Sequence, residues 1–148
     1  KMKINYESDQ TSSILLGKAK EADIPKYGIA QIKNNSKLPG LGLVEKIIEK
    51  PSLKKAPSNF FAAGRYIFNN NFLKYLSKAK PDKSNEIQLT DAIDNYIQDN
   101  NELCAFPLDG EVFDCGDNIQ YILANLEFAI KDPKIKPHIK KFLKNKLF

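Results

Sequence analysis

The sequence is poor in the side chains that most often carry acid–base or metal chemistry. His138 is its only histidine, and it lies in a lysine-rich segment where a solvated histidine is expected. Cys104 and Cys115 have neither the C-x-x-C spacing nor the histidine neighbour of a zinc site or a redox pair. We therefore expect two reduced structural thiols and no reaction that needs a histidine base.

Long hydrophobic runs are also missing. No stretch approaches the roughly 20 apolar residues that cross a bilayer, and residues 1–10 contain no apolar signal-peptide core. The sequence therefore predicts a cytoplasmic protein without a membrane partner. A chain of 148 residues with 42% hydrophobic content can bury one core and is too short for two domains of usual size.

The positive charge of the chain is concentrated at one end. The formal net charge is +5, and residues 131–148 contain seven lysines and one aspartate. Without interleaved aromatic residues or a nucleic-acid motif, such a stripe indicates a solvated helix face rather than a nucleic-acid site. We expect a main body over residues 1–130 and a basic helical tail over 131–148.

Strand-like and helix-like segments alternate along the main body, which predicts an α/β domain. Short apolar or alternating runs indicate strands, and apolar residues at helical spacing indicate helices. The segment 34–42 predicts a hairpin-like loop because it contains Pro39, Gly40 and Gly42. The expected strands are 14–16, 27–30, 43–48, 60–68, 103–107 and 111–113, and the expected helices are a turn or short helix at 21–26, then 71–79, 90–97, 119–129 and 139–143.

Four local features sharpen these expectations. Alternation along 43–48 places Val44 and Ile47 on opposite faces of a strand. The strand 60–68 is apolar apart from Arg65, as in a strand that is buried on both faces. Thr90 is placed to cap the helix that follows it, and Asp109-Gly110 is placed to join two strands in a turn.

Three polar or glycine-containing stretches lie at element boundaries, where α/β folds collect ligand-binding residues. Each also fits a structural role, because a Glu-Lys pair can end a strand in solvent and an Asp-x-Gly-Asp segment can cap a helix. The stretches are Glu49-Lys50-Pro51, Ala56–Asn59 leading into Gly64-Arg65-Tyr66, and Phe113–Asp117.

The order and spacing of six motifs resemble the bacterial UTP:glucose-1-phosphate uridylyltransferases. The resemblance covers nearly the whole chain, to about Lys131, and the EIQLTDAI and APSN…GRY strings separate it from thymidylyltransferases. It implies an α/β fold that is the C-terminal part of a Rossmann-like nucleotidyltransferase domain, with a mixed β-sheet and flanking helices. The motifs are KYGI at 26–29, EKP at 49–51, APSN at 56–59, GRY at 64–66, EIQLTDAI at 86–93 and FDCGD at 113–117.

Enzymes of this family form UDP-glucose and pyrophosphate from UTP and glucose 1-phosphate with Mg²⁺, and the resemblance implies a homo-oligomer for the full-length enzyme. The glycine-rich nucleotide loop and the LPDD-type metal-binding aspartate of the family have no counterpart here. We therefore expect a chain that supplies the sugar-phosphate half of the site and is inactive alone. A truncated, non-catalytic module for sugar-phosphate binding or oligomerisation is the alternative, and a dTTP-dependent enzyme is a third reading that EIQLTDAI disfavours.

The resemblance also assigns roles to five residues. Lys50 would contact the sugar phosphate as the catalytic cation, and Glu49 would accept hydrogen bonds from glucose hydroxyls. Gly28 and Gly64 would allow the backbone to approach the sugar, although each could instead be a turn or packing residue. Asp114 would be the second Mg²⁺ ligand of the family, since Mg²⁺ prefers hard oxygen donors.

Two further residues of these motifs are expected to have structural roles. We expect Asp117 to cap the helix that follows it rather than to bind metal. Arg65 is expected to form an ion pair within the fold.

Overall fold

The computed structural model describes residues 1–35, 40–82 and 85–147. It divides into two compact units, Lys1–Gly110 and Glu111–Phe148. The predicted boundary after residue 130 falls near the end of a helix of the second unit and stays a prediction about domain organisation.

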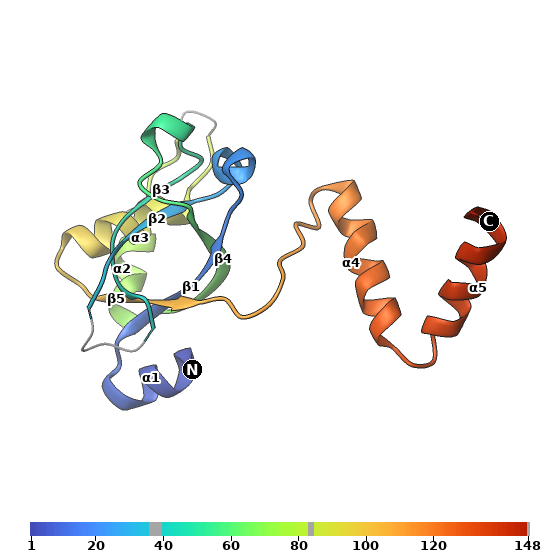
Figure 1. The fold of residues 1–148 in the computed structure, drawn as a ribbon. Coiled ribbons are helices and arrows are strands. Elements are labelled where there is room, and N and C mark those ends of the chain that lie inside the picture. Colours follow the sequence, from blue (N-terminus) through green and yellow to red (C-terminus); the bar gives the residue numbers. More distant parts are fainter. Residues whose placement is uncertain (36–39, 83–84, 148) are drawn as a thin grey trace. The chain divides into compact units, whose positions relative to one another are not determined.

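The first unit contains five strands joined by short helices, and Figure 1 shows them in chain order. Most lie where the sequence predicts them. The elements are α1 (Met2–Asp9), β1 (Ser12–Lys18), η1 (Glu21–Lys26), β2 (Ile29–Lys33), β3 (Gly42–Ile48), η2 (Leu53–Lys55), β4 (Phe60–Ile67), η3 (Asn70–Phe72), α2 (Leu73–Leu76), α3 (Leu89–Gln98) and β5 (Leu103–Pro107).

The five strands close into a small barrel in the order β1-β4-β2-β3-β5. β1 and β5 are parallel, and the other neighbouring strands are antiparallel. The predicted mixed sheet is therefore confirmed. Part of the predicted hairpin loop between β2 and β3, residues 36–39, lies outside the described residues.

The alternation predicted for β3 is wrong, because a β-bulge interrupts it. Gln31 pairs with Lys46 while Ile32 pairs with Val44, so Glu45 is an extra residue in the ladder. The bulge shifts the phase of the strand, and Val44 and Ile47 are both buried in the main core. With simple alternation, one of these two side chains would have pointed away from the main core.

Two-sided burial of β4 is confirmed only in its first half. Phe60 and Ala62 pack against the main core, whereas Phe61 packs with Ile24 and Ile29 in a second cluster. Beyond Ala62 the pairing with β1 becomes irregular. Residues 64–65 leave the regular ladder there and are exposed, which is why the strand is not buried along its whole length.

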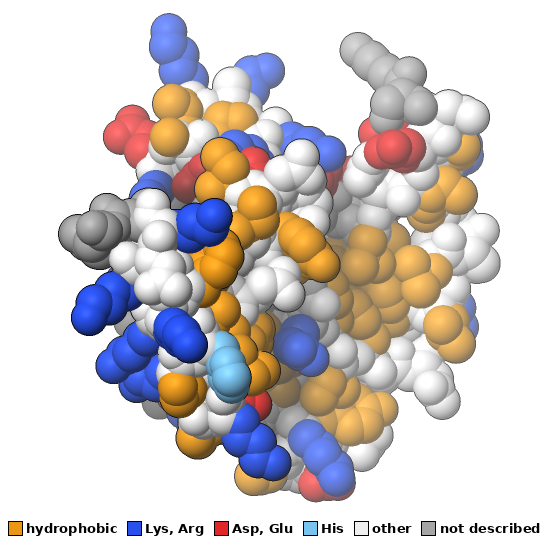
Figure 2. All heavy atoms as spheres, turned by 90° about the vertical axis from the view of Figure 1, so that its right-hand side faces the viewer, with side chains coloured by type: hydrophobic (Ala, Val, Ile, Leu, Met, Phe, Trp, Pro, Cys, Tyr) orange, Lys and Arg blue, Asp and Glu red, His pale blue; other side chains and the backbone are white. Residues whose placement is uncertain are grey.

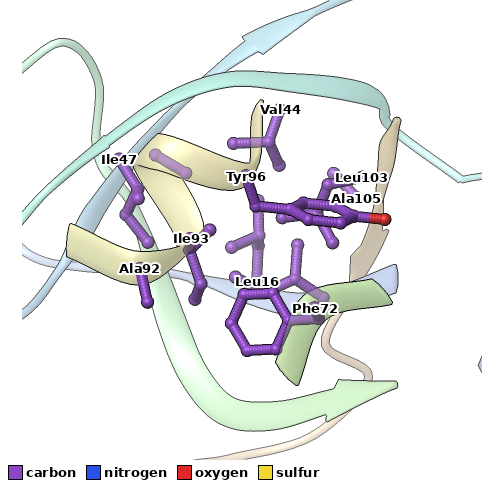
Figure 3. Close-up of a cluster of buried hydrophobic side chains, with 11 residues drawn as sticks. Leu16, Val44, Ile47, Phe72, Ala92, Ile93, Tyr96, Leu103 and Ala105 are labelled. Atoms are coloured by element: carbon purple, nitrogen blue, oxygen red, sulfur yellow. The ribbon is translucent and has the colours of Figure 1, made fainter. Parts of the chain in front are cut away.

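The main core joins α3 to the inside of the barrel. Ala92, Ile93 and Tyr96 of α3 meet side chains of β1, β3 and β5, as Figure 3 shows. Tyr96 is also packed edge-to-face against Phe72, with ring centroids 5.5 Å apart. Its hydroxyl is 2.9 Å from Ser12 Oγ, so this buried tyrosine has a polar partner.

Thr90 is not the N-cap of α3, contrary to the prediction. The helix begins at Leu89 with Gln88 in the extended capping position, and Thr90 lies within the first turn. The predicted helix 71–79 is shorter and partly 3₁₀, since η3 is followed by the single turn of α2.

The second unit is a pair of helices, α4 (Asn118–Lys131) and α5 (Lys136–Leu147). The predicted strand at 111–113 and the predicted Asp109-Gly110 hairpin turn are both wrong, because residues 108–114 form no strand. A lone three-residue segment gains no ladder hydrogen bonds without a partner strand. On α4 the predicted apolar face is largely exposed, with 68% exposure at Ile119 and 58% at Ile122.

Figure 2 shows that hydrophobic side chains and lysines are both present among the surface atoms of the chain. Within the described part of the chain, no helix has the length and apolar character needed to span a membrane. Both cysteines are unpaired, as predicted, with Cys104 buried and Cys115 exposed.

Candidate functional site

The site begins where β3 ends, at Glu49 and Lys50. Glu49 is half-buried and Lys50 is exposed. Lys50 has a φ of 42°, a left-handed conformation that residues with side chains adopt only when their surroundings stabilise it. Its N–H donates to the Tyr27 carbonyl at 3.0 Å, which fixes this turn against the residue before Gly28.

The Glu49 carboxylate is held by α3. Thr90 Oγ1 donates to Glu49 Oε2 at 3.0 Å, and Thr90 is only 6% exposed. Within the described residues, Glu49 Oε1 accepts no hydrogen bond. One carboxylate oxygen is thus oriented by the protein, and the other has no hydrogen-bond donor among the described residues.

Gly28 lies against this same pair. A Cβ at position 28 would be 2.8 Å from Thr90 Cγ2 and 3.0 Å from Glu49 Oε2, so a side chain there would displace Thr90 and crowd Glu49. The Gly28 carbonyl accepts a hydrogen bond from Ala62 N at 2.9 Å, so the residue is also tied to β4. The structure therefore brings Gly28, Glu49 and Lys50 together, and space rather than backbone conformation requires glycine at position 28.

Tyr66 of β4 is influenced electrostatically by the same carboxylate. Burial of the phenol, and then the negative charge of Glu49, raise the pKa of Tyr66 above its usual value. Tyr66 lies in the GRY motif, but nothing in the sequence marks it as a site residue. Thr90 was likewise missed, since it was expected to cap a helix.

Gly64 occupies the irregular part of β4, two residues before Tyr66. Its φ is +74°, and a Cβ built there would meet nothing within 4 Å. Glycine at this position is explained by backbone conformation, and the space beside it is open. Neighbouring Arg65 is exposed, and within the described part of the chain it forms no ion pair, so its predicted structural role is wrong.

A polar pocket of about 730 Å³ lies on the α3 side of Glu49. Both lysines and aspartates line it, including Lys46 from β3 and Asp91 and Asp94 from α3. Asp94 Oδ1 also accepts a hydrogen bond from Ile47 N at 3.2 Å. Glu49 is the predicted site residue that lines this pocket; Lys50 and Gly28 do not line it.

Asp114 belongs to the second unit. It is exposed, and its Oδ1 accepts a hydrogen bond from Gly116 N at 3.0 Å. Its predicted convergence with Lys50 stays a prediction, because the two units are described separately. Among the described residues no three His, Cys, Asp or Glu side chains gather as a metal centre. A single exposed carboxylate fits one ligand of a Mg²⁺ ion that otherwise binds water and phosphate oxygens.

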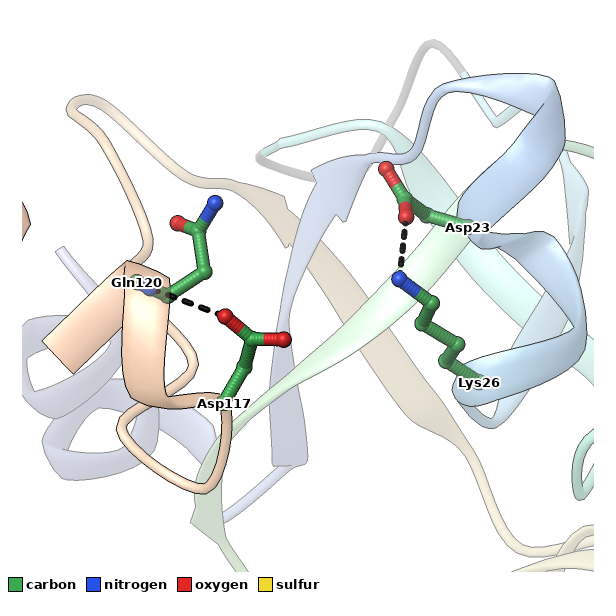
Figure 4. Close-up of polar contacts among 4 residues, drawn as sticks. All are labelled: Asp23, Lys26, Asp117 and Gln120. Carbon is green, nitrogen blue, oxygen red and sulfur yellow. Dashed lines mark hydrogen bonds and ion pairs between the residues drawn. The ribbon is translucent and has the colours of Figure 1, made fainter.

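Asp117 caps α4 as the sequence predicts. Its carboxylate accepts a hydrogen bond from Gln120 N at 2.9 Å, and the bond is drawn in Figure 4. The same figure shows the ion pair of Asp23 and Lys26 within η1, 2.8 Å apart, which lies in the first unit.

The barrel is a mixed sheet, and a Glu-Lys pair with an adjacent glycine lies where β3 ends. The model of the nucleotidyl transferase family matches residues 2–130, and the chain belongs to this family. The predicted α/β fold is thereby confirmed.

The relatives within this family are more specific. The chain is 37% identical over 141 residues to the UTP–glucose-1-phosphate uridylyltransferase of Haemophilus influenzae, covering 95% of this chain and 48% of that protein. The UTP-bound enzyme of this kind from Acinetobacter baumannii is 28% identical with a TM-score of 0.80, covering 98% of this chain and 49% of that one. A UDP-glucose pyrophosphorylase in complex with UDP-glucose is 30% identical with a TM-score of 0.79, covering 88% and 49%.

These matches confirm the resemblance to UTP:glucose-1-phosphate uridylyltransferases across nearly the whole chain. The chain spans about half the length of the curated relatives it matches.

Proposed function

We propose that this chain supplies the sugar-phosphate half of the active site of a UTP:glucose-1-phosphate uridylyltransferase. The observation that carries the proposal is the end of β3, where a carboxylate with one open oxygen precedes an exposed lysine on a constrained backbone. A carboxylate can accept hydrogen bonds from sugar hydroxyls, and a neighbouring ammonium can pair with the phosphate of the same sugar. The relatives named for this activity support the choice of substrate.

The proposed reaction requires alignment more than acid–base chemistry. A phosphate oxygen of glucose 1-phosphate attacks the α-phosphorus of UTP, and the bond from that phosphorus to the bridging oxygen of pyrophosphate breaks. The nucleophile is already an anion, so no general base is needed, in keeping with the scarcity of histidine. Lys50 would neutralise charge where two polyanions meet, while Glu49 and the backbone at Gly28 and Gly64 hold the sugar.

Magnesium is part of this proposal, with Asp114 as one of its ligands. When bound, the ion would draw negative charge from the phosphate oxygens. Asp114 can bind the ion because its carboxylate is exposed and only Oδ1 accepts the hydrogen bond from Gly116 N. Oδ2 would then be the oxygen that binds Mg²⁺.

A second reading is favoured by the helices of the second unit. Exposed Ile119, Ile122 and Phe128 give α4 an apolar surface of the kind that marks protein association. Under this reading the chain is a non-catalytic module for sugar-phosphate binding or oligomerisation. The homo-oligomeric state and the cytoplasmic location stay predictions under both readings.

Pyrophosphate release and ligand binding separate the two readings. The 148 residues contain no G-x-G-T-R loop, so we expect the chain alone to bind glucose 1-phosphate without turning over UTP. Adding the separately expressed N-terminal half of a relative should start pyrophosphate release, and Lys50→Ala should suppress it. Binding without any activity under complementation would favour the non-catalytic module, and turnover by the chain alone above the Lys50→Ala control would contradict the division of the site.

A further inference from the structure

Thr90 is the residue that fixes the Glu49 carboxylate. We propose that Thr90 is a positioning residue for sugar recognition: its hydroxyl orients Glu49 so that one carboxylate oxygen faces the glucose hydroxyls. The inference rests on the proposed function of Glu49 and adds a residue that the family motifs alone did not assign to recognition.

The first support is the direction of the Thr90 hydroxyl. A threonine in the first turn of a helix can bond to its own backbone, which satisfies the helix and leaves nothing for a neighbour. Here Gln88 occupies the capping position, and Thr90 Oγ1 donates to Glu49 Oε2 across a sequence separation of 41 residues. The hydroxyl therefore joins α3 to the end of β3.

The second support is the enclosure of the pair. The backbone at Gly28 lies against both partners, so closely that a Cβ there would meet each of them within 3.0 Å. Thr90 itself is buried, which strengthens its hydrogen bond to a carboxylate and makes the loss of the donor costly. Together these contacts restrict Glu49 to few orientations.

The third support is the open oxygen. Among the described residues, Glu49 Oε1 accepts no hydrogen bond, whereas Oε2 is held by Thr90. A carboxylate fixed in this way can accept a ligand hydroxyl without first losing side-chain freedom. Preorganisation of this kind lowers the cost of binding.

Two matched substitutions test the proposal in the 148-residue chain. Thr90→Val keeps the shape of the side chain and removes the donor, and Thr90→Ser keeps the donor. We expect Thr90→Val to weaken glucose 1-phosphate binding roughly tenfold and to leave the affinity for inorganic phosphate unchanged. Thr90→Ser should bind both probes like the unchanged chain.

The titration of Tyr66 is a readout that is independent of the ligand. Since the Glu49 charge contributes to the raised pKa of Tyr66, a carboxylate that leaves its position must change that pKa. In chain labelled with ¹³C at the tyrosine Cζ, the Tyr66 pKa should change in Thr90→Val and stay constant in Thr90→Ser. Glu49→Gln gives the full contribution of the charge for comparison, and Thr90→Ala replaces Thr90→Val if the latter does not unfold cooperatively.

An unchanged Tyr66 pKa in Thr90→Val, with an unchanged ratio of affinities for glucose 1-phosphate and phosphate, would overturn the proposal. Failure of the unsubstituted chain to bind glucose 1-phosphate would instead count against the proposed function. In that case the Tyr66 titration alone decides whether Thr90 fixes Glu49.

Discussion

Glu49 and Lys50 are sequence neighbours with different physical surroundings. Glu49 is half-buried and hydrogen-bonded, whereas Lys50 is exposed and is constrained through its backbone. Such a pair can divide recognition from charge neutralisation. Under the proposed function, the carboxylate would discriminate among hydroxyl patterns and the ammonium would act on phosphate.

We predict that Lys50→Ala lowers kcat of the complemented enzyme by a factor on the order of 10² to 10³, because a preorganised charge at the reacting phosphates is lost. Steady-state rates of pyrophosphate release would measure this. Lys54→Ala, which removes an exposed lysine from η2, is the matched control and should leave kcat unchanged. An effect of Lys50→Ala on KM alone would make Lys50 a simple binding residue.

The two cysteines should differ sharply in reactivity. Burial raises the pKa of the Cys104 thiol, and its side chain is inaccessible, whereas Cys115 is exposed. We expect iodoacetamide at pH 8 to modify Cys115 rapidly and Cys104 only when the first unit unfolds. Mass spectrometry with Cys115→Ser as the control checks this, since that variant should remain unmodified under native conditions.

The sequence could reveal the residues of the site that stand in contiguous motifs and could not reveal their spatial partners. Glu49, Lys50 and Gly28 were predicted from their motifs, and the structure brings them together. Thr90 joins them through a hydrogen bond between distant segments, and Tyr66 through the electrostatic effect of Glu49 on its pKa. Such contacts depend on how α3 and β4 pack, which no local pattern encodes.

The first turn of α4 is capped by the side chain of Asp117. Asp117 accepts a hydrogen bond from Gln120 N, which otherwise has no partner within the helix. We predict that Asp117→Ala destabilises the first turn of α4 by about 1 kcal/mol. Amide hydrogen exchange at Gln120 should then accelerate roughly fivefold, the factor that corresponds to that energy.

Asp117→Asn is the control for this prediction, because asparagine is also a good N-cap. Its exchange rate at Gln120 should lie near that of the unsubstituted chain. Equal rates in all three proteins would mean that the cap does not stabilise α4 in solution.

The elements themselves were predictable where periodicity was regular. The strands β1 and β5 and the helix α3 follow from their apolar spacing, and the structure confirms them. The phase of β3 was not predictable, because a bulge at Glu45 is a matter of pairing between strands. The segment 111–113 has strand-like composition but no partner strand, so composition alone misled.

At the scale of the whole molecule, the chain consists of two units that meet in sequence near Gly110. Residues 108–114 carry no helix or strand, and Glu111 is exposed. We predict that a glutamate-specific protease cleaves first after Glu111, since exposed segments outside regular structure are preferred sites of proteolysis. Mass spectrometry of the early products should show the 1–111 and 112–148 fragments.

Glu111→Gln should remove that early cleavage while sites in the first unit remain slow. Glu102 is the relevant comparison, because it is also exposed but directly precedes β5. Early cleavage after Glu102 in place of Glu111 would show that the boundary between the units lies elsewhere.

The parallel pairing of β1 with β5 affects folding during synthesis as well as the stability of the finished barrel. Ser12 pairs with Leu103, so the barrel cannot close until nearly all of the first unit has left the ribosome. Until then one edge of β1 stays unpaired, and nascent chains with open strand edges are prone to associate. Slow codons placed after β5 would give the barrel time to close before the helical unit is synthesised, whereas a pause before β5 would prolong the exposed state.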